Sequence, residues 1–564
     1  MSFIRTIFRS LFEGFSLWRR LNNHASVMEA LRIRIIFSCV FGLLILSVTI
    51  YKLCDIMVIR NVIQKISTKD DNNNVVLKCD ILDRNGEVLA TCVTTASCYA
   101  DPSVVIDVNE ASEKLSGIPG MPKADTIKER IKDKQKRFVW IARHVTPQIQ
   151  QKIIDIGIPG IYFQKDYKRI YPYGSLFSHV IGCTDIDSTG ASGIERAFDN
   201  VLRKKNLSLT LDLRIQSIVY EELKTAIEKY RAIGGNVTVI NMRGEIIAMV
   251  SFPDFEPNNI KQKDIRSMFN RNTLGVYEPG SIFKILNTAI ALESGSAKLN
   301  STYDATAPIK IGKFTVTDFR GKNRILSLAE AFVFSSNLAS IKIAQQFGTR
   351  TQKEFMKKFG VLEKSSVELQ EVGPPLIPKV WQESTLMTIS YGYGIALSPL
   401  QLLTSVASLV NMGERVYPTI VLDNVKYHGE KVISDNTSLI MRDLMRAAVC
   451  FGTAKKADVE GAEIFGKTGT AYKNSGKGYG TEGNRSKIVT FVGGFSKNNP
   501  QYMMIVMLDE PHPTEETYGY STAGWNAAPT AGKIFKRIVP VLCNYENNEN
   551  KTELIVTKYL NLGR

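Results

Sequence analysis

Ser281 and Lys284, three positions apart, could serve as a nucleophile and its base. They open the segment SIFKILNTAIALE. Apolar residues would occupy almost every face of a helix formed by this segment, so we expect it to be buried on most sides. The two side chains would then share one face at the helix N-terminus. Burial lowers the pKa of a lysine, and a neutral amine can take the proton of a serine hydroxyl. Taken alone, the pair is more often a serine N-cap followed by a lysine that reaches solvent.

A second polar group, Ser335-Ser336-Asn337, lies between the apolar run FVF and a helical pattern. A simple helix cap would explain it. The alternative is a proton relay, in which the Ser335 hydroxyl passes a proton between the lysine and a leaving group. The Asn337 amide would then hold a carbonyl of the substrate.

The segment GAEIFGKT at 461–468 matches the phosphate-binding loop pattern G-x-x-x-x-G-K-[ST] letter for letter. Such a loop needs a buried strand before it and a helix opening at the lysine. Here KKADVE precedes it, and a glycine- and asparagine-rich stretch follows. We therefore predict no nucleotide site, but an extended strand with Lys467 and Gly469 on one face and Thr468 and Thr470 on the other. Glycine within a strand often marks the close approach of another backbone.

The elements around these motifs predict an α+β fold. The segments 236–251 and 487–510 each indicate a β-hairpin, so an antiparallel sheet would close late in the chain. A largely helical pattern occupies 281–450, and a short helix at 531–542 could cover one face of the sheet. Strands at both ends with helices between them are typical of α+β domains.

The N-terminal part of the chain predicts a membrane anchor followed by a non-catalytic domain at 60–205. Residues 35–55 contain an uncharged apolar run long enough for a transmembrane helix, and arginines outnumber acidic residues before it. We expect a cytoplasmic segment at 1–34, a single-pass anchor and an exported remainder. The long preceding segment and the lack of a small-x-small cleavage site favour an anchor over a cleaved signal peptide.

Composition excludes several classes of site. The formal charge is +16, but lysines and arginines are spread along the chain, so we expect a solvated surface and no nucleic acid partner. The five histidines are scattered without HExxH or close carboxylates, which argues against a zinc site and against a two-histidine iron site. Among the eight cysteines there is no CxxC pair. One exported pair could form a disulfide, although the spacing does not identify it.

Together, the ordered motifs S-x-x-K, S-x-N and K-T-G resemble the active-site signature of penicillin-binding proteins and serine β-lactamases. Further stretches are similar to class B penicillin-binding proteins, which are anchored transpeptidases with a pedestal domain below the catalytic one. Examples are LDRNGEVLA (82–90), GASGIERAFD (190–199) and YGYGIALSPLQLLTSVASLVNMG (391–413). The resemblance implies a pedestal of the dimerisation type at 60–205, a transpeptidase domain at 206–545 and a tail at 546–564.

Within class B, three features are more similar to the division (septal) branch than to the elongation branch. These are Glu278 before Pro279-Gly280, the long linker after KTGTA, and the ending GYSTAGWNAAPTAGKIF at 519–535. One departure lies in the pedestal, where Lys78-Cys79 stands in place of the Arg-Gly of the family.

The resemblance implies that Ser281 attacks a stem peptide ending in D-Ala-D-Ala, releases D-alanine and passes the acyl group to an amine of a neighbouring stem. Lys284 would be the base, and Ser335 and Lys467 would return the proton to the leaving amine. Backbone amides of Ser281 and Thr470 would form the oxyanion hole. The substrate carboxylate would be held in the strand Lys467-Thr468-Gly469-Thr470. This chemistry would require no metal and no cofactor, and a β-lactam would acylate the same serine.

The resemblance also implies a place in the bacterial inner membrane, with the catalytic domain in the periplasm. Expected partners are stem peptides on lipid-linked glycan strands, β-lactams, a glycosyltransferase and membrane proteins of the divisome. The alternatives are an elongation-type enzyme, a D,D-carboxypeptidase, a β-lactamase or β-lactam sensor, and a catalytically idle division scaffold.

Overall fold

The computed structural model describes most of the chain after residue 76. The described ranges are 77–260, 266–312, 314–425, 429–473, 486–542 and 554–560, with several helical positions between 35 and 49. Residues 1–75 and 76–564 form two separate compact units. Apart from those helical positions, the predicted cytoplasmic segment and anchor lie outside the described residues. In the part that is described, the helices are all too short or too polar to cross a membrane.

A five-stranded antiparallel sheet carries the C-terminal part of the chain, in the order β12-β13-β14-β6-β7. Its strands are β6 (Gly234–Asn241), β7 (Ile246–Phe252), β12 (Phe465–Tyr472), β13 (Lys487–Gly494) and β14 (Tyr502–Asp509). The hairpins β6–β7 and β13–β14 are the two that the sequence predicts, and β14 joins them by pairing with β6. The predicted α+β class is therefore confirmed, and β12 lies at one edge of the sheet.

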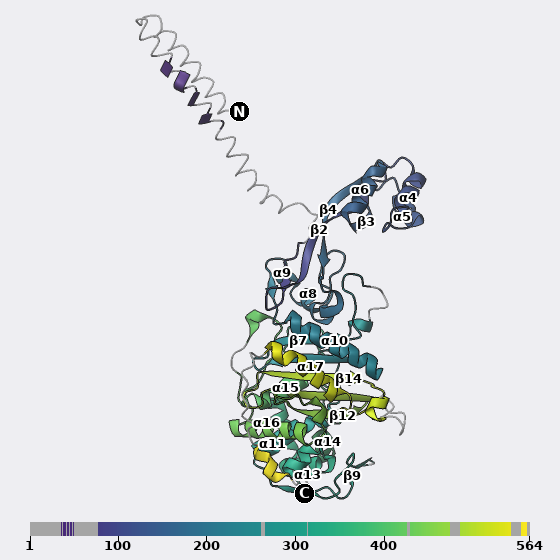
Figure 1. Ribbon diagram of the computed structural model, residues 1–564. Helices are drawn as coiled ribbons and strands as arrows, with labels where there is room; N and C mark the ends of the chain where they lie inside the picture. The colour runs from purple at the N-terminus through teal and green to yellow at the C-terminus, as the bar shows by residue number, and fades with distance from the viewer. Residues whose placement is uncertain are drawn as a thin grey trace, which may run out of the picture. The chain divides into compact units, whose positions relative to one another are not determined.

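Helices cover both faces of this sheet (Figure 1). Phe491 and Val506 pack with α10 (Leu213–Tyr230) and α17 (Ala527–Leu542), whereas the next positions, Val492 and Ile505, belong to the core on the other side. Burial on both faces explains why these strands are nearly continuous apolar runs. The last helix begins at Ala527, four residues before the predicted start.

The second face of the sheet is covered by a helical layer. Its members are α11 (Phe283–Glu293), α12 (Leu328–Val333), α13 (Asn337–Lys358), α14 (Glu383–Ser390), α15 (Pro399–Val410) and α16 (Asp435–Cys450). Two small antiparallel pairs interrupt the segment predicted as largely helical. They are β8 (Thr302–Asp304) with β11 (Ile325–Ser327), and β9 (Ile309–Ile311) with β10 (Phe314–Val316). Strands of three residues are too short to show a period in the sequence.

A second sheet lies in the segment before α10. Its strands are β1 (Ile81–Leu82), β2 (Val88–Ala100), β3 (Val139–Val145), β4 (Ile161–Ile170) and β5 (Leu207–Ser208). Helices α4 (Val108–Ser116), α5 (Ala124–Ile131) and α6 (Pro147–Ile156) share a core with it, and short helices α7 (Ser178–Ile181), α8 (Gly193–Ala197) and α9 (Asp199–Leu202) follow. Asn85-Gly86 forms the turn between β1 and β2, since Gly86 has φ +89° and the two strands pair antiparallel.

Lys78, which stands where the family has arginine, is buried in an ion-pair network. Its Nζ lies 2.9 Å from Glu195 Oε2 and 2.6 Å from Asp199 Oδ1. Arg169 Nε reaches the other Glu195 oxygen at 2.6 Å. The lysine therefore finds two carboxylates beside the β1–β2 hairpin, and the hairpin forms.

The end of the chain returns to the main core. Within the predicted tail, η8 (Ile555–Tyr559) buries Val556 completely, and Ser327 Oγ donates to Tyr559 O at 2.8 Å. The cysteines in the described part, Cys39, Cys79, Cys92, Cys98, Cys183 and Cys450, are all free thiols. Cys54 and Cys543 lie outside the described residues.

Candidate active site

Ser281 lies in a tight turn that precedes the buried helix. The turn η4 (Gly280–Ile282) is 3-10, and α11 begins only at Phe283, so the prediction of a helix starting at Ser281 was wrong by two residues. Gly280 has φ +52°, and a Cβ there would lie 2.8 Å from the carbonyl oxygen of Thr470. The turn is thus pressed against strand β12, which leaves room only for glycine at this position.

Lys284 extends from the first turn of α11 into the protein and is only 1% exposed. Its Nζ donates to Ser335 O at 2.6 Å, to Asn337 Oδ1 at 2.7 Å and to Ser335 Oγ at 3.3 Å. Burial, reinforced by the charge of Lys467, holds the pKa of Lys284 well below its ordinary value. The lysine therefore favours the neutral amine that a base needs.

Lys467 reaches the same hydroxyl from the edge strand β12. Its Nζ donates to Ser335 Oγ at 2.9 Å and to its neighbour Thr468 O at 3.3 Å. The side chain is fully buried, and burial lowers the pKa of Lys467 to about 7. Ser335 Oγ thus lies between two buried amines, and burial lowers the pKa of both.

The strand places its alternate residues as the sequence predicts. A Cβ on Gly469 would lie 2.7 Å from Ile282 Cγ1 and 2.9 Å from Pro279 O, which confirms the close approach of another backbone. Thr468 is on the opposite face, 6% exposed, with its hydroxyl 2.5 Å from that of Thr453. Thr470 Oγ1 accepts a hydrogen bond from Ala523 N at 3.1 Å.

The same strand excludes a phosphate-binding loop. Residues 465–472 form one continuous strand, so Lys467 lies inside a strand and not at the opening of a helix. The residues that follow the lysine continue this strand and pair with β13, so no helix N-terminus is present there to hold a phosphate.

Asp318 belongs to the site and was missed from the sequence. Its carboxylate accepts hydrogen bonds from Ser336 Oγ, Asn337 N and Leu338 N. A lone aspartate in the polar segment VTDFRG, 18 residues before Ser336, gives no periodicity or spacing that would mark it.

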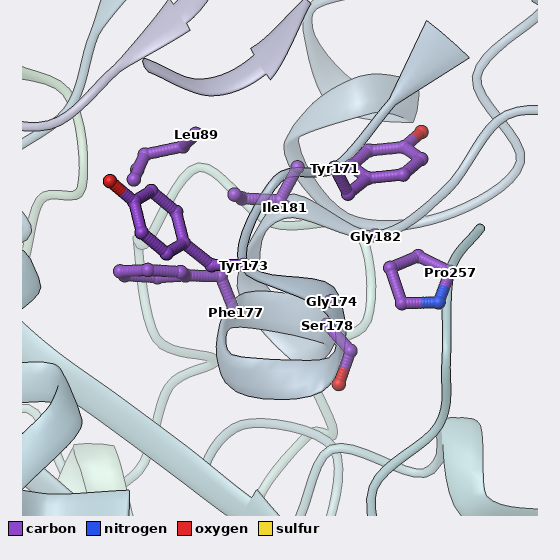
Figure 2. Close-up of a pocket in the computed structure, with 9 residues that line it drawn as sticks. All are labelled: Leu89, Tyr171, Tyr173, Gly174, Phe177, Ser178, Ile181, Gly182 and Pro257. Atoms are coloured by element: carbon purple, nitrogen blue, oxygen red, sulfur yellow. The ribbon is translucent and has the colours of Figure 1, made fainter. Parts of the chain in front are cut away.

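Within the described ranges, no three histidine, cysteine, aspartate or glutamate side chains converge to form a metal site. The hollow in Figure 2 lies elsewhere, between the start of β2 and the turn η2 (Gly174–Phe177). It is lined mainly by apolar side chains, including Leu89, Tyr171 and Phe177, and is too small to hold a water molecule. None of the three motifs contributes a residue to its lining.

Comparison with known families agrees with this geometry. A penicillin-binding protein transpeptidase domain matches residues 235–538, and a penicillin-binding protein dimerisation domain matches 78–209. This chain belongs to the class B penicillin-binding proteins. The transpeptidase match spans β6 to α17 and includes all three motifs.

Relatives of this penicillin-binding protein are similar along most of its length. The "Probable peptidoglycan D,D-transpeptidase FtsI" of Caulobacter vibrioides is 34% identical, covering 84% of this chain and 82% of the relative. The peptidoglycan D,D-transpeptidase FtsI of Escherichia coli is 28% identical over 80% of this chain and 82% of its own. Stage V sporulation protein D of Bacillus subtilis is 29% identical over 82% and 78%.

Among solved structures, one described as a peptidoglycan glycosyltransferase from Atopobium parvulum superposes with a TM-score of 0.64. It is 21% identical and covers 82% of this chain and 97% of its own. At that identity the similarity shows the fold alone.

Proposed function

We propose that this penicillin-binding protein is a peptidoglycan D,D-transpeptidase of the septal type. The observation that carries the proposal is the convergence of two buried lysines on Ser335 Oγ beside the turn that presents Ser281. The FtsI-type relatives support both the reaction and the septal assignment.

The proposed reaction is an acyl transfer in two steps. Neutral Lys284 takes the proton of Ser281, whose Oγ attacks the carbonyl of the penultimate D-alanine and forms an acyl-enzyme. Ser335, supplied by Lys467, passes a proton to the nitrogen of the departing D-alanine. The amine of a second stem peptide then attacks the acyl carbon, gives up a proton and restores the Ser281 hydroxyl.

Several groups are proposed to hold the substrate. Backbone amides of Ser281 and Thr470 would stabilise the oxyanion, and Asn337 would bind a carbonyl of the stem. Lys467, with the hydroxyls of Thr468 and Thr470, would bind the terminal carboxylate. The Thr470 hydroxyl accepts from Ala523 N, so its own hydrogen can be donated to the carboxylate. The Thr468 hydroxyl can do the same when it accepts from Thr453 Oγ1.

The proposal extends to the organisation of the whole chain. It comprises a cytoplasmic segment (1–34), an anchor (35–55), a pedestal (60–205), a transpeptidase domain (206–545) and a tail (546–564). The apolar run and the arginines before it support an inner-membrane location with the catalytic domain in the periplasm. Because the reaction joins stems on existing glycan strands, we expect a glycosyltransferase and division proteins as partners.

Cross-linking by the purified full-length protein tests the proposed reaction. With a glycosyltransferase and a lipid-linked disaccharide pentapeptide, wild-type protein and the control Ser294→Ala should yield cross-linked muropeptide dimers by mass spectrometry. Ser281→Ala should yield none. Monomers that lose D-alanine without dimers would instead identify a D,D-carboxypeptidase, and dimers from Ser281→Ala would contradict the proposed nucleophile.

The septal assignment is tested by depleting the protein in its own cells. Filaments without septa are expected if the cross-links serve division. Round cells would contradict the septal assignment and favour the elongation branch.

A further inference from the structure

The loop between β10 and β11 holds the Ser335–Asn337 turn through Asp318. One carboxylate oxygen accepts from Ser336 Oγ at 2.6 Å. The other accepts from the backbone amides of Asn337 at 2.5 Å and Leu338 at 3.1 Å. Asp318 therefore satisfies amides at the N-terminus of α13, where a helix leaves its first N–H groups unpaired and favours negative charge.

These contacts go beyond an ordinary helix cap. Ser336 already caps α13, because its own side chain accepts from Ala339 N at 3.0 Å. The residue before it, Ser335, has φ +59°, a conformation that a non-glycine residue keeps only when its surroundings impose it. Asp318 holds Ser336 and Asn337, the two residues after Ser335, and so helps to keep the Ser335 hydroxyl between the two lysines.

The loop also orients the Asn337 side chain. Asn337 Nδ2 donates to Thr317 O at 2.9 Å, so the opposite end of the amide, Oδ1, is directed to Lys284 Nζ at 2.7 Å. Thr317 and Asp318 thus hold the side chain and the backbone of the same asparagine, and through it they position the amine of Lys284.

Asp318 is also the anion that acts on Lys284. Lys284 feels the repulsive charge of Lys467 from β12 and the opposing charge of Asp318. The other acidic residues on the helices packed against α11 have partners of their own, which are Arg324 for Glu330, Arg350 for Glu354, Gln345 for Glu383, Lys431 for Asp435 and Lys497 for Asp443. The first turn of α13 carries no acidic residue.

We propose that Asp318 is a positioning residue of the transpeptidase: it fixes the Ser335–Asn337 turn against Lys284 so that both proton-transfer groups face the Ser281 turn. The proposal rests on the proposed function. It assigns Asp318 no contact with substrate, so its effect must appear through Lys284 and Ser335.

The test is the rate of acylation of the full-length protein by a fluorescent penicillin, measured between pH 5 and pH 9. Asp318→Asn should lower the second-order rate constant by roughly 10- to 100-fold at the optimum, because small displacements of catalytic groups are costly. The rate rises with pH as Lys284 loses its proton. Removing the Asp318 charge lowers the pKa of Lys284 further, so this acid limb should move to lower pH.

Two variants separate positioning from general stability. Asp318→Glu keeps the charge but displaces it, so the rate should fall while the acid limb stays near its wild-type position. Asp107→Asn removes a carboxylate that caps α4 through Asn109 N and Glu110 N, and it should leave both the rate and the limb unchanged.

The outcomes discriminate clearly. A folded Asp318→Asn protein with the wild-type rate and an unmoved acid limb would overturn the role of Asp318. If that variant does not fold, Asp318→Glu decides, and a wild-type rate in it would likewise overturn the proposal. Failure of the wild-type protein to be acylated would instead overturn the proposed function.

Discussion

At the scale of the residue, the site is defined by two amines that share one hydroxyl. Lys284 and Lys467 both donate to Ser335 Oγ, and both are almost completely buried. Two ammonium groups this close in an apolar setting repel each other and lose hydration, so at least one favours the neutral form near pH 7. This arrangement places a base and an acid in contact with the Ser335 hydroxyl, which can pass a proton between them.

The burial of Lys467 should cost the protein stability in a pH-dependent way. Its folded pKa is about 7 against 10.5 for a free lysine, so between these values the unfolded chain binds a proton that the folded protein lacks. Stability therefore rises with pH across this window and is lowest below about pH 7. Lys467→Met should raise the free energy of unfolding by roughly 1–3 kcal/mol at pH 6 and by less at pH 9.

Urea denaturation of both proteins at the two pH values measures this difference. Lys467→Met also removes a charge that lowers the pKa of Lys284, and this acts in the same direction, because the repulsion between the two lysines is greatest at low pH. An equal gain at pH 6 and pH 9, or a loss at pH 6, would contradict the assigned cause.

The motif residues could be predicted because their chemistry depends on short spacings: Ser281 and Lys284 are one helical turn apart, and Ser335 and Asn337 share one cap. Asp318 could not, since its contact with Ser336 depends on how a separate loop folds back onto α13. In the sequence, a single acidic residue in a polar loop looks the same as an acidic residue in any solvated turn.

At the scale of the element, the site depends on the contact between turn η4 and strand β12. Gly469 faces Ile282 and Pro279 without space for a side chain, and Gly280 faces Thr470. The approach brings the Ser281 backbone beside the strand from which Lys467 extends. Two glycines on facing elements therefore set the distance between nucleophile and strand.

Gly469→Ala should disrupt this contact. The added methyl would lie 2.7 Å from Ile282 Cγ1 and 2.9 Å from Pro279 O, and the backbone oxygen cannot rotate away. The turn and the strand must then separate, and we expect the rate of acylation by a penicillin to fall by about 100-fold or more.

Gly117→Ala is the matched control, since Gly117 has ordinary helical φ of −67° and its new Cβ would meet only van der Waals contacts from 3.5 Å. It should acylate at the wild-type rate. An unimpaired Gly469→Ala protein would show that the contact between η4 and β12 is not required.

Elements buried on both faces were the easiest to predict. Strands β6, β7, β13 and β14 are continuous apolar runs joined by short turns, so both hairpins appear in the sequence. Strands β3 and β4 were not identified, because their segments FVWIARHV and IYFQKDYKRI mix charged with apolar residues and remain partly exposed.

At the scale of the whole molecule, a buried ion-pair network connects distant parts of the chain. Lys78 lies before β1, Arg169 lies at the end of β4, and both contact Glu195 on α8. The three side chains are no more than 1% exposed. Removing one partner of such a network leaves a charge without compensation in a medium that solvates it poorly.

Glu195→Gln should therefore lower the free energy of unfolding by about 3–5 kcal/mol, because a neutral amide does not compensate the buried charges of Lys78 and Arg169. Glu354→Gln is the control, since it breaks an exposed pair with Arg350 on α13 and should cost less than about 0.5 kcal/mol. Both are measured by urea denaturation of the full-length protein. Equal effects of the two substitutions would contradict the importance of the buried network.

The way in which the helices and strands of the chain pack together could be predicted only in part. The class α+β followed from strands at both ends of the catalytic segment, but the pairing of β14 with β6 depends on long-range contacts that no local pattern records. The same holds for η8, whose return to the core places Val556 among residues far away in the sequence.

The central claim is that Ser281 forms the acyl-enzyme of a penicillin-binding transpeptidase, and intact mass after exposure to benzylpenicillin tests it most directly. Wild-type protein should gain the mass of one penicillin molecule, located by peptide mapping on Ser281, and Ser281→Ala should gain none. No adduct on folded wild-type protein, or an adduct that persists in Ser281→Ala, would contradict the account.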